Sequence, residues 1–227
     1  MKPELRRVGK SQSPVVVIDE FSGALERILT IAENLGPYPP STNYYPGLRR
    51  KIMKADKAAA AYVVETCERA GQFIEGVFEI DGFDLLEASF SMVTVMSSAL
   101  SMPQRAPHFD TTDQKHLALL HYLRVPEETG TAFYRQRSTG IERVSEFNVD
   151  LFVETAKTEV ARLAPDSGYI HGSNQFFEQI GAVEAVPDRL IMYQGSLIHS
   201  SIIPPAMKLS PDPRRGRLTA NLFVQGH

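Results

Sequence analysis

The order of the periodic patterns along the chain is the feature that most limits its fold. Two helical stripes come early, at residues 21–35 and 55–70. From about residue 89 onward the apolar runs are short, alternating or β-branched, and turn signals separate them. Helices first and strands later do not match the alternation that parallel sheets require. The pattern therefore predicts an α+β fold, a double-stranded β-helix (jelly roll) with flanking N-terminal helices.

Length and local composition predict a single domain over residues 1–227. Residues 1–13 are polar and basic, so we expect a flexible arm there. The β-branched run at 14–18 predicts a buried strand. A third helical stripe begins after Asn148, which could cap it, and reaches about Leu163.

Charge and cysteine content exclude several classes of partner. The net charge is −3 without a long run of one sign, so neither nucleic acid nor an anionic membrane is an expected partner. The single Cys67 favours a reducing compartment. The apolar run at 15–18 is too short for a signal peptide or a membrane span. We expect a soluble, cytoplasmic protein, whose oligomeric state the sequence does not indicate.

One short stretch carries residues typical of a metal site. His108 and Asp110 are two positions apart, so in an extended segment their side chains point to the same side. A strand-like run leads to His199, and another carries Arg217 and Thr219 on one face. Two histidines, a carboxylate and an arginine are the parts of a 2-His-1-carboxylate iron site with an anchored acidic cosubstrate.

Each of these residues also has an ordinary interpretation. The His108 and Asp110 pair could form only a turn hydrogen bond, His199 could be a core or surface imidazole, and Arg217 could join a salt bridge. His116, His121 and His171 compete as ligands, although strand alternation turns His121 away from the face of Tyr122. The Pro- and Tyr-rich loop at 37–49 is either a packing loop or a substrate-facing segment that presents Tyr44, Tyr45 and Arg49.

The order of these motifs resembles the iron(II)/2-oxoglutarate-dependent dioxygenases, in the prolyl-4-hydroxylase-like branch, and is most similar to an uncharacterised bacterial subgroup. The resemblance covers roughly residues 90–224. The pieces that carry it are Pro-His-Phe-Asp at 107–110, Leu-Leu-His-Tyr-Leu at 119–123, Glu-Glu-Thr-Gly-Thr-Ala-Phe at 127–133, the run at 188–193 that leads to His199, and Arg-Leu-Thr at 217–219.

The resemblance implies the cofactors Fe(II) and 2-oxoglutarate and assigns residues to them. It implies that His108, Asp110 and His199 hold the iron, with no catalytic residue beyond these ligands. It also implies that Arg217, Thr219 and Tyr122 bind the distal carboxylate of 2-oxoglutarate. The sequence departs from the family pattern in two ways. Arg217 follows His199 at a wider spacing than usual, and the family's second cosubstrate-binding tyrosine has no counterpart just upstream of His108.

The resulting hypothesis is an Fe(II)/2-oxoglutarate-dependent dioxygenase that hydroxylates an unactivated C–H bond of a small-molecule or peptide substrate. Two alternatives stay open. One is a jelly-roll binding protein without turnover. The other is a zinc hydrolase with the same His/Asp/His ligands, since this donor set also suits zinc. Arg217 separates the possibilities, because a hydrolase has no need of a buried carboxylate anchor.

Overall fold

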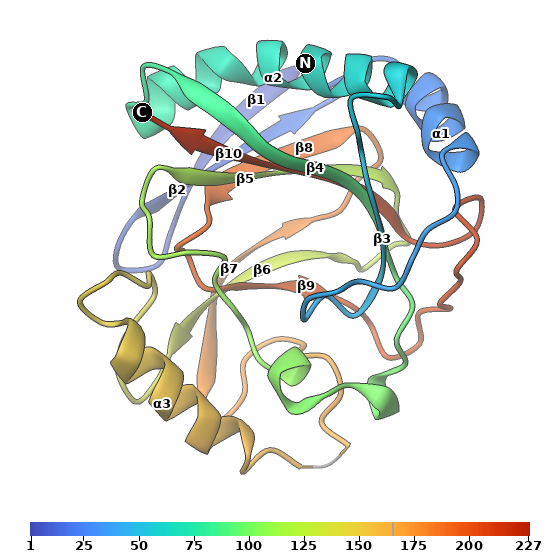
Figure 1. Ribbon diagram of the computed structural model, residues 1–227. Helices are drawn as coiled ribbons and strands as arrows, with labels where there is room; N and C mark the ends of the chain where they lie inside the picture. The colour runs from blue at the N-terminus through green and yellow to red at the C-terminus, as the bar shows by residue number, and fades with distance from the viewer. Residues whose placement is uncertain (165) are drawn as a thin grey trace.

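The strands form two antiparallel sheets that face each other, with helices outside both (Figure 1). The structure is a computed structural model that describes residues 1–164 and 166–227. The large sheet has the order β1-β2-β8-β5-β10-β4-β3, and the small sheet has the order β7-β6-β9. The large sheet consists of β1 (Lys2–Val8), β2 (Ser13–Asp19), β3 (Gly47–Lys51), β4 (Phe83–Val93), β5 (His116–Arg124), β8 (Arg189–Gln194) and β10 (Leu218–Gly226). The small sheet consists of β6 (Gly130–Gln136), β7 (Phe177–Glu184) and β9 (His199–Ile202), and the helices are α1 (Leu25–Asn34), α2 (Lys57–Phe78), α3 (Val149–Val160) and the short 3-10 helices η1 (Ser97–Ala99) and η2 (Met102–Arg105).

Strand alternation divides the interior into two packed layers. On β10, Leu218, Ala220, Leu222 and Val224 pack with α1 and α2 in the outer core, as do alternate residues of β2, β4, β5 and β8. The intervening residues of these strands face the small sheet and form the inner core with Phe133. Helix α3 covers the far side of the small sheet. The arrangement confirms the double-sheet jelly roll with helices packed outside it.

The prediction of a loose N-terminal arm was wrong for most of residues 1–13. Lys2–Val8 form β1 and pair with β2 along their whole length, from Lys2 opposite Asp19 to Val8 opposite Ser13. The strand lies at the edge of the large sheet and buries only Val8. An edge strand has one neighbour and tolerates charged side chains, so its polar composition gave no strand signal.

The observed helix boundaries differ from those expected from the sequence. In the second helix, packing outweighs local propensity. The helix expected at 55–70 runs from Lys57 to Phe78, through Gly71, because Ile74 continues its buried face. The next residue, Glu79, caps the helix with a left-handed φ of 57°. The helix expected at 21–35 begins only at Leu25. None of the helices in the described residues is both long and apolar enough to cross a membrane.

A buried chain of hydrogen bonds ties α2 to the outer face of the large sheet. His121 points to this side, as alternation with Tyr122 predicted. Its Nδ1 lies 2.9 Å from the Tyr62 hydroxyl of α2, and its Nε2 lies 3.0 Å from Asp188. Burial opposes ionisation of Asp188, but hydrogen bonds from His121, Ser22 and the Gly23 amide outweigh it and hold its pKa well below its usual value.

We expect Tyr62→Phe to lower the free energy of unfolding by about 1–3 kcal/mol, because it leaves the buried His121 Nδ1 without a donor. Urea denaturation measures the change. Tyr38→Phe is the matched control, since the Tyr38 hydroxyl donates to a helix carbonyl, that of Ala32, at a partly buried position. Equal, small effects of both substitutions would show that the Tyr62 bond contributes no more than an ordinary hydroxyl.

Candidate metal centre

The backbone brings the segment that carries His108 and Asp110 against the start of β9. The amide of His108 donates to the His199 carbonyl at 2.9 Å, and the amide of His199 returns a bond to the His108 carbonyl at 2.8 Å. The amide of Asp110 donates to the carbonyl of Gly195 at 2.7 Å. These bonds fix the segment as an extended stretch beside β9, so residues distant in sequence present their side chains to one point.

His108, Asp110 and His199 offer ligand atoms that all lie within 4.8 Å of one another. The distance from Asp110 to His108 Nε2 is 4.0 Å, and that to His199 Nε2 is 3.8 Å. The other ring nitrogen of His199, Nδ1, donates to the Leu197 carbonyl at 2.7 Å. That bond leaves the lone pair on Nε2, the atom that faces the other two side chains, as metal-binding histidines require.

The electrostatics of the three side chains suit a cation. Burial lowers the pKa of His199 to about 4. The pKa of His108 also falls to about 4, through desolvation by surrounding protein atoms and then the neighbouring His199, although its side chain is 58% exposed to the pocket. Burial raises the pKa of Asp110. Both imidazoles are therefore neutral near pH 7 and free to bind a metal, whose charge would favour the Asp110 carboxylate.

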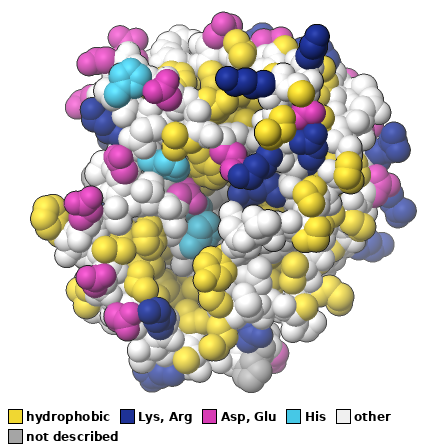
Figure 2. Space-filling model, in the orientation of Figure 1, with side chains coloured by type: hydrophobic (Ala, Val, Ile, Leu, Met, Phe, Trp, Pro, Cys, Tyr) yellow, Lys and Arg dark blue, Asp and Glu magenta, His cyan; other side chains and the backbone are white. Residues whose placement is uncertain are grey.

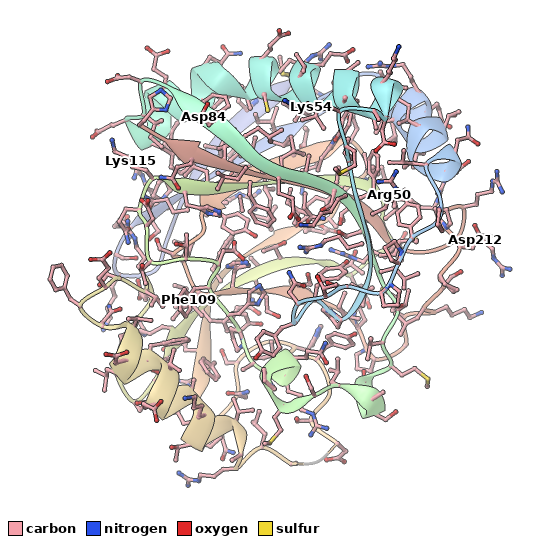
Figure 3. The ribbon with its side chains drawn as sticks, in the orientation of Figure 1. Arg50, Lys54, Asp84, Phe109, Lys115 and Asp212 are labelled. Atoms are coloured by element: carbon pink, nitrogen blue, oxygen red, sulfur yellow. The ribbon has the colours of Figure 1, made fainter. Side chains whose placement is uncertain are left out.

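Phe109, between the two ligands, points to the other side. Its ring packs edge-on against Phe152 of α3, with 5.6 Å between centroids. In Figure 3, Phe109 lies on the side of the molecule that carries α3. The alternation that the sequence predicted for 108–110 is thus observed, and the hydrophobic contact of Phe109 anchors the segment.

A small cavity of about 80 Å³ extends inward from the three side chains between the sheets. Arg217 and Thr219 face it from the start of β10, on the side opposite Leu218 and Ala220. Arg217 is 3% exposed, and its Nε and Nη2 have no hydrogen-bond partner among the described residues. A buried guanidinium with unpaired N–H groups is costly, so this position suits a carboxylate ligand.

Tyr45 lines this cavity, whereas Tyr122 is not among its lining residues. The Tyr122 hydroxyl is bonded to Thr131 Oγ1 at 2.7 Å, and its ring lies 5.9 Å from the Arg217 guanidinium carbon. The Tyr45 hydroxyl is buried and has no partner among the described residues. Burial raises the pKa of Tyr45, and the charge of Arg217 acts in the opposite direction. Tyr45 and Arg217 thus both line the small cavity, and each has a buried polar atom without a partner among the described residues.

A larger cavity of about 540 Å³ is lined by His108 and Asp110, but not by His199, and opens toward solvent. Figure 2 shows the hollow, with histidine and acidic side chains along one wall and basic side chains opposite. Arg49 lines both cavities, and Tyr44 is 74% exposed at the rim of the larger one. His116 also lines the larger cavity, whereas His171 is exposed elsewhere on the surface.

A family model covers almost the whole chain. The Family of unknown function (DUF6445) matches residues 1–224. The chain belongs to the DUF6445 family. No curated protein matches the sequence.

Solved structures similar to this DUF6445 chain include proteins that depend on or bind 2-oxoglutarate, and a prolyl-4-hydroxylase. SnoN, a non-heme α-ketoglutarate-dependent epimerase from nogalamycin biosynthesis, is 11% identical with a TM-score of 0.58, over 95% of this chain and 79% of SnoN. HygX from Streptomyces hygroscopicus, solved with nickel and 2-oxoglutarate, is 16% identical with a TM-score of 0.56, over 95% and 84%. A Pseudomonas putida prolyl-4-hydroxylase is 12% identical with a TM-score of 0.50, over 96% and 94%. The chain therefore has the fold of the family that its sequence resembles.

Proposed function

We propose that this DUF6445 protein is an Fe(II)/2-oxoglutarate-dependent oxygenase that hydroxylates an unactivated C–H bond. The observation that carries the proposal is the unpaired, buried Arg217, which faces the same small cavity as His108, Asp110 and His199. The fold shared with SnoN and HygX supports it, since both were solved with an iron or nickel ion and 2-oxoglutarate or α-ketoglutarate.

The donor set fits ferrous iron. His108, Asp110 and His199 would hold the iron as two neutral imidazoles and one carboxylate, a donor set that suits a non-heme iron site open to a cosubstrate. When bound, the iron and its cosubstrate supply the oxidising chemistry. Asp110 would supply the carboxylate ligand at the position that a halide would otherwise need, which favours hydroxylation over halogenation.

The residues of the chain bind and orient the cosubstrate, and they exclude water from it. The Arg217 guanidinium receives the distal carboxylate of 2-oxoglutarate, and the hydroxyls of Thr219 and Tyr45 donate to the same group. Tyr122 takes a supporting role, with its ring against Arg217 and its hydroxyl held by Thr131. Enclosure between the two sheets keeps these contacts out of water, which strengthens them.

The alternatives lack a comparable observation. A zinc hydrolase would use the same three ligands but leaves Arg217 and Tyr45 without a function. Formation of succinate from 2-oxoglutarate, measured with and without candidate substrates, tests the proposal. Absence of succinate under every condition in the iron-loaded protein would favour a binding protein without turnover.

We expect Tyr45→Phe to raise the dissociation constant of 2-oxoglutarate about threefold to thirtyfold, the effect of one hydroxyl hydrogen bond to a charged group. Metal affinity should not change, because Tyr45 is not a ligand. Calorimetric titration of the metal-loaded protein measures both. Tyr44→Phe, which alters the exposed neighbour, is the control. Identical 2-oxoglutarate affinity in wild type and Tyr45→Phe would show that Tyr45 does not bind the cosubstrate, and would favour its earlier interpretation as a residue that faces the substrate.

A further inference from the structure

We infer that the primary substrate carries an anionic group, a carboxylate or a phosphate, that Arg49 holds at the boundary between the two cavities. The inference rests on the proposed function and adds a substrate class to it. Arg49 lines the large cavity together with His108 and Asp110, and it also lines the small cavity that contains Arg217.

The guanidinium of Arg49 is positioned but not neutralised. Its Nε donates to Ser91 Oγ at 3.3 Å, and its carbon lies over the Tyr45 ring, 4.7 Å from the centroid. The side chain is 13% exposed. Neither terminal nitrogen has a hydrogen-bond acceptor among the described residues. A fixed, largely buried guanidinium with two free N–H edges suits a two-pronged contact with a carboxylate or phosphate.

The nearest carboxylate compensates this charge only in part, through a long ion pair. Glu87 lies 3.9 Å from Arg49 Nη1, which is beyond hydrogen-bond distance. Glu87 instead forms a close ion pair with Lys51, which follows on β3. Glu87 is thus shared between two cations, and only Arg49 and Glu87 of the three line the large cavity. The terminal nitrogens of Arg49 stay available there for an anion from outside.

Two features assign this anion to the substrate and not to the cosubstrate. Arg217, Thr219 and Tyr45 already surround the small cavity, and Arg217 does not line the large one. The large cavity, about 540 Å³, is in the range of small-molecule sites. Arg49, His108 and Asp110 line the same cavity. An anion bound there would hold the rest of the substrate beside the metal.

The test uses matched probes that differ in charge. Phenylacetate, phenyl phosphate and the uncharged phenylacetamide are titrated calorimetrically into the full-length protein loaded with metal and 2-oxoglutarate, without O₂. We expect at least one anion to bind about tenfold or more tightly than the amide. Arg49→Ala should abolish that preference, and Arg49→Lys should restore part of it. Lys54→Ala, which removes an exposed positive charge that lines neither cavity, is the control and should keep it.

Several outcomes would overturn the inference. They are equal binding of anions and amide by the wild type, no binding of either anion, and anion binding that survives Arg49→Ala, which would place the anion on the metal. A loss of 2-oxoglutarate affinity in Arg49→Ala as large as that in Arg217→Ala would assign Arg49 to the cosubstrate. Failure of the proposed function is a separate result, because the wild type would then not bind 2-oxoglutarate before any probe is added.

Discussion

Replacing Arg217 with alanine is expected to raise the dissociation constant of 2-oxoglutarate about tenfold to a few hundredfold, the scale of one charged hydrogen-bonded contact of roughly 1.5–3 kcal/mol. The reason is that Arg217 is buried with Nε and Nη2 unpaired, so the cosubstrate carboxylate is the partner that offsets the cost of its burial. Calorimetric titration of the metal-loaded variant with 2-oxoglutarate measures the change.

The companion substitution Arg217→Lys separates charge from geometry. Lysine keeps the charge but presents a single ammonium, so we expect only part of the affinity to return. Affinity for the metal should be unchanged in both variants, because Arg217 is not among the candidate ligands. Wild-type affinity for 2-oxoglutarate in Arg217→Ala would remove this residue from the site.

The second large effect concerns the metal. We expect His199→Ala or Asp110→Ala to weaken Fe(II) binding by more than about a hundredfold, since loss of a ligand exceeds the 10–100-fold effects typical of residues that support ligands. Each substitution leaves two ligands of three. Dialysis of anaerobically loaded protein followed by metal analysis should show about one iron per wild-type chain, as a single site of this type requires, and almost none in the variants.

His116→Ala is the matched control for these variants. His116 lines the large cavity beside Asp110, but its Nδ1 is buried and it does not belong to the three-residue cluster. It should retain its iron. If His116→Ala lost the metal while His199→Ala kept it, the ligand assignment would be wrong.

The parts of the site that lie on single strands could be predicted from sequence. Alternation placed His108 and Asp110 on one side with Phe109 on the other, and it placed Arg217 and Thr219 opposite Leu218 and Ala220. These predictions need only the period of a strand. His199 required the additional knowledge that a strand leads to it and ends near the site.

The sequence indicated Tyr45 only as a candidate on the substrate side, because its position at the cavity that Arg217 lines depends on long-range pairing. The strand that follows it, β3, pairs with β4, with Gly47 opposite Val93. A Cβ on Gly47 would lie 1.9 Å from the Met92 carbonyl oxygen, so only glycine allows the two strands to approach. Nothing near Tyr45 in sequence indicates this pairing. The same limit applies to β1, whose partner is identified only by the finished sheet.

The most direct test of the account is the visible absorption of the protein with Fe(II) and 2-oxoglutarate in the absence of O₂. If His108, Asp110 and His199 hold iron with open positions, and Arg217 directs the cosubstrate to them, the chelate should give a charge-transfer band that saturates at about one iron per chain. At the same concentrations Arg217→Ala should show little of it. Iron bound by the wild type without any such band, at saturating 2-oxoglutarate, would contradict the account.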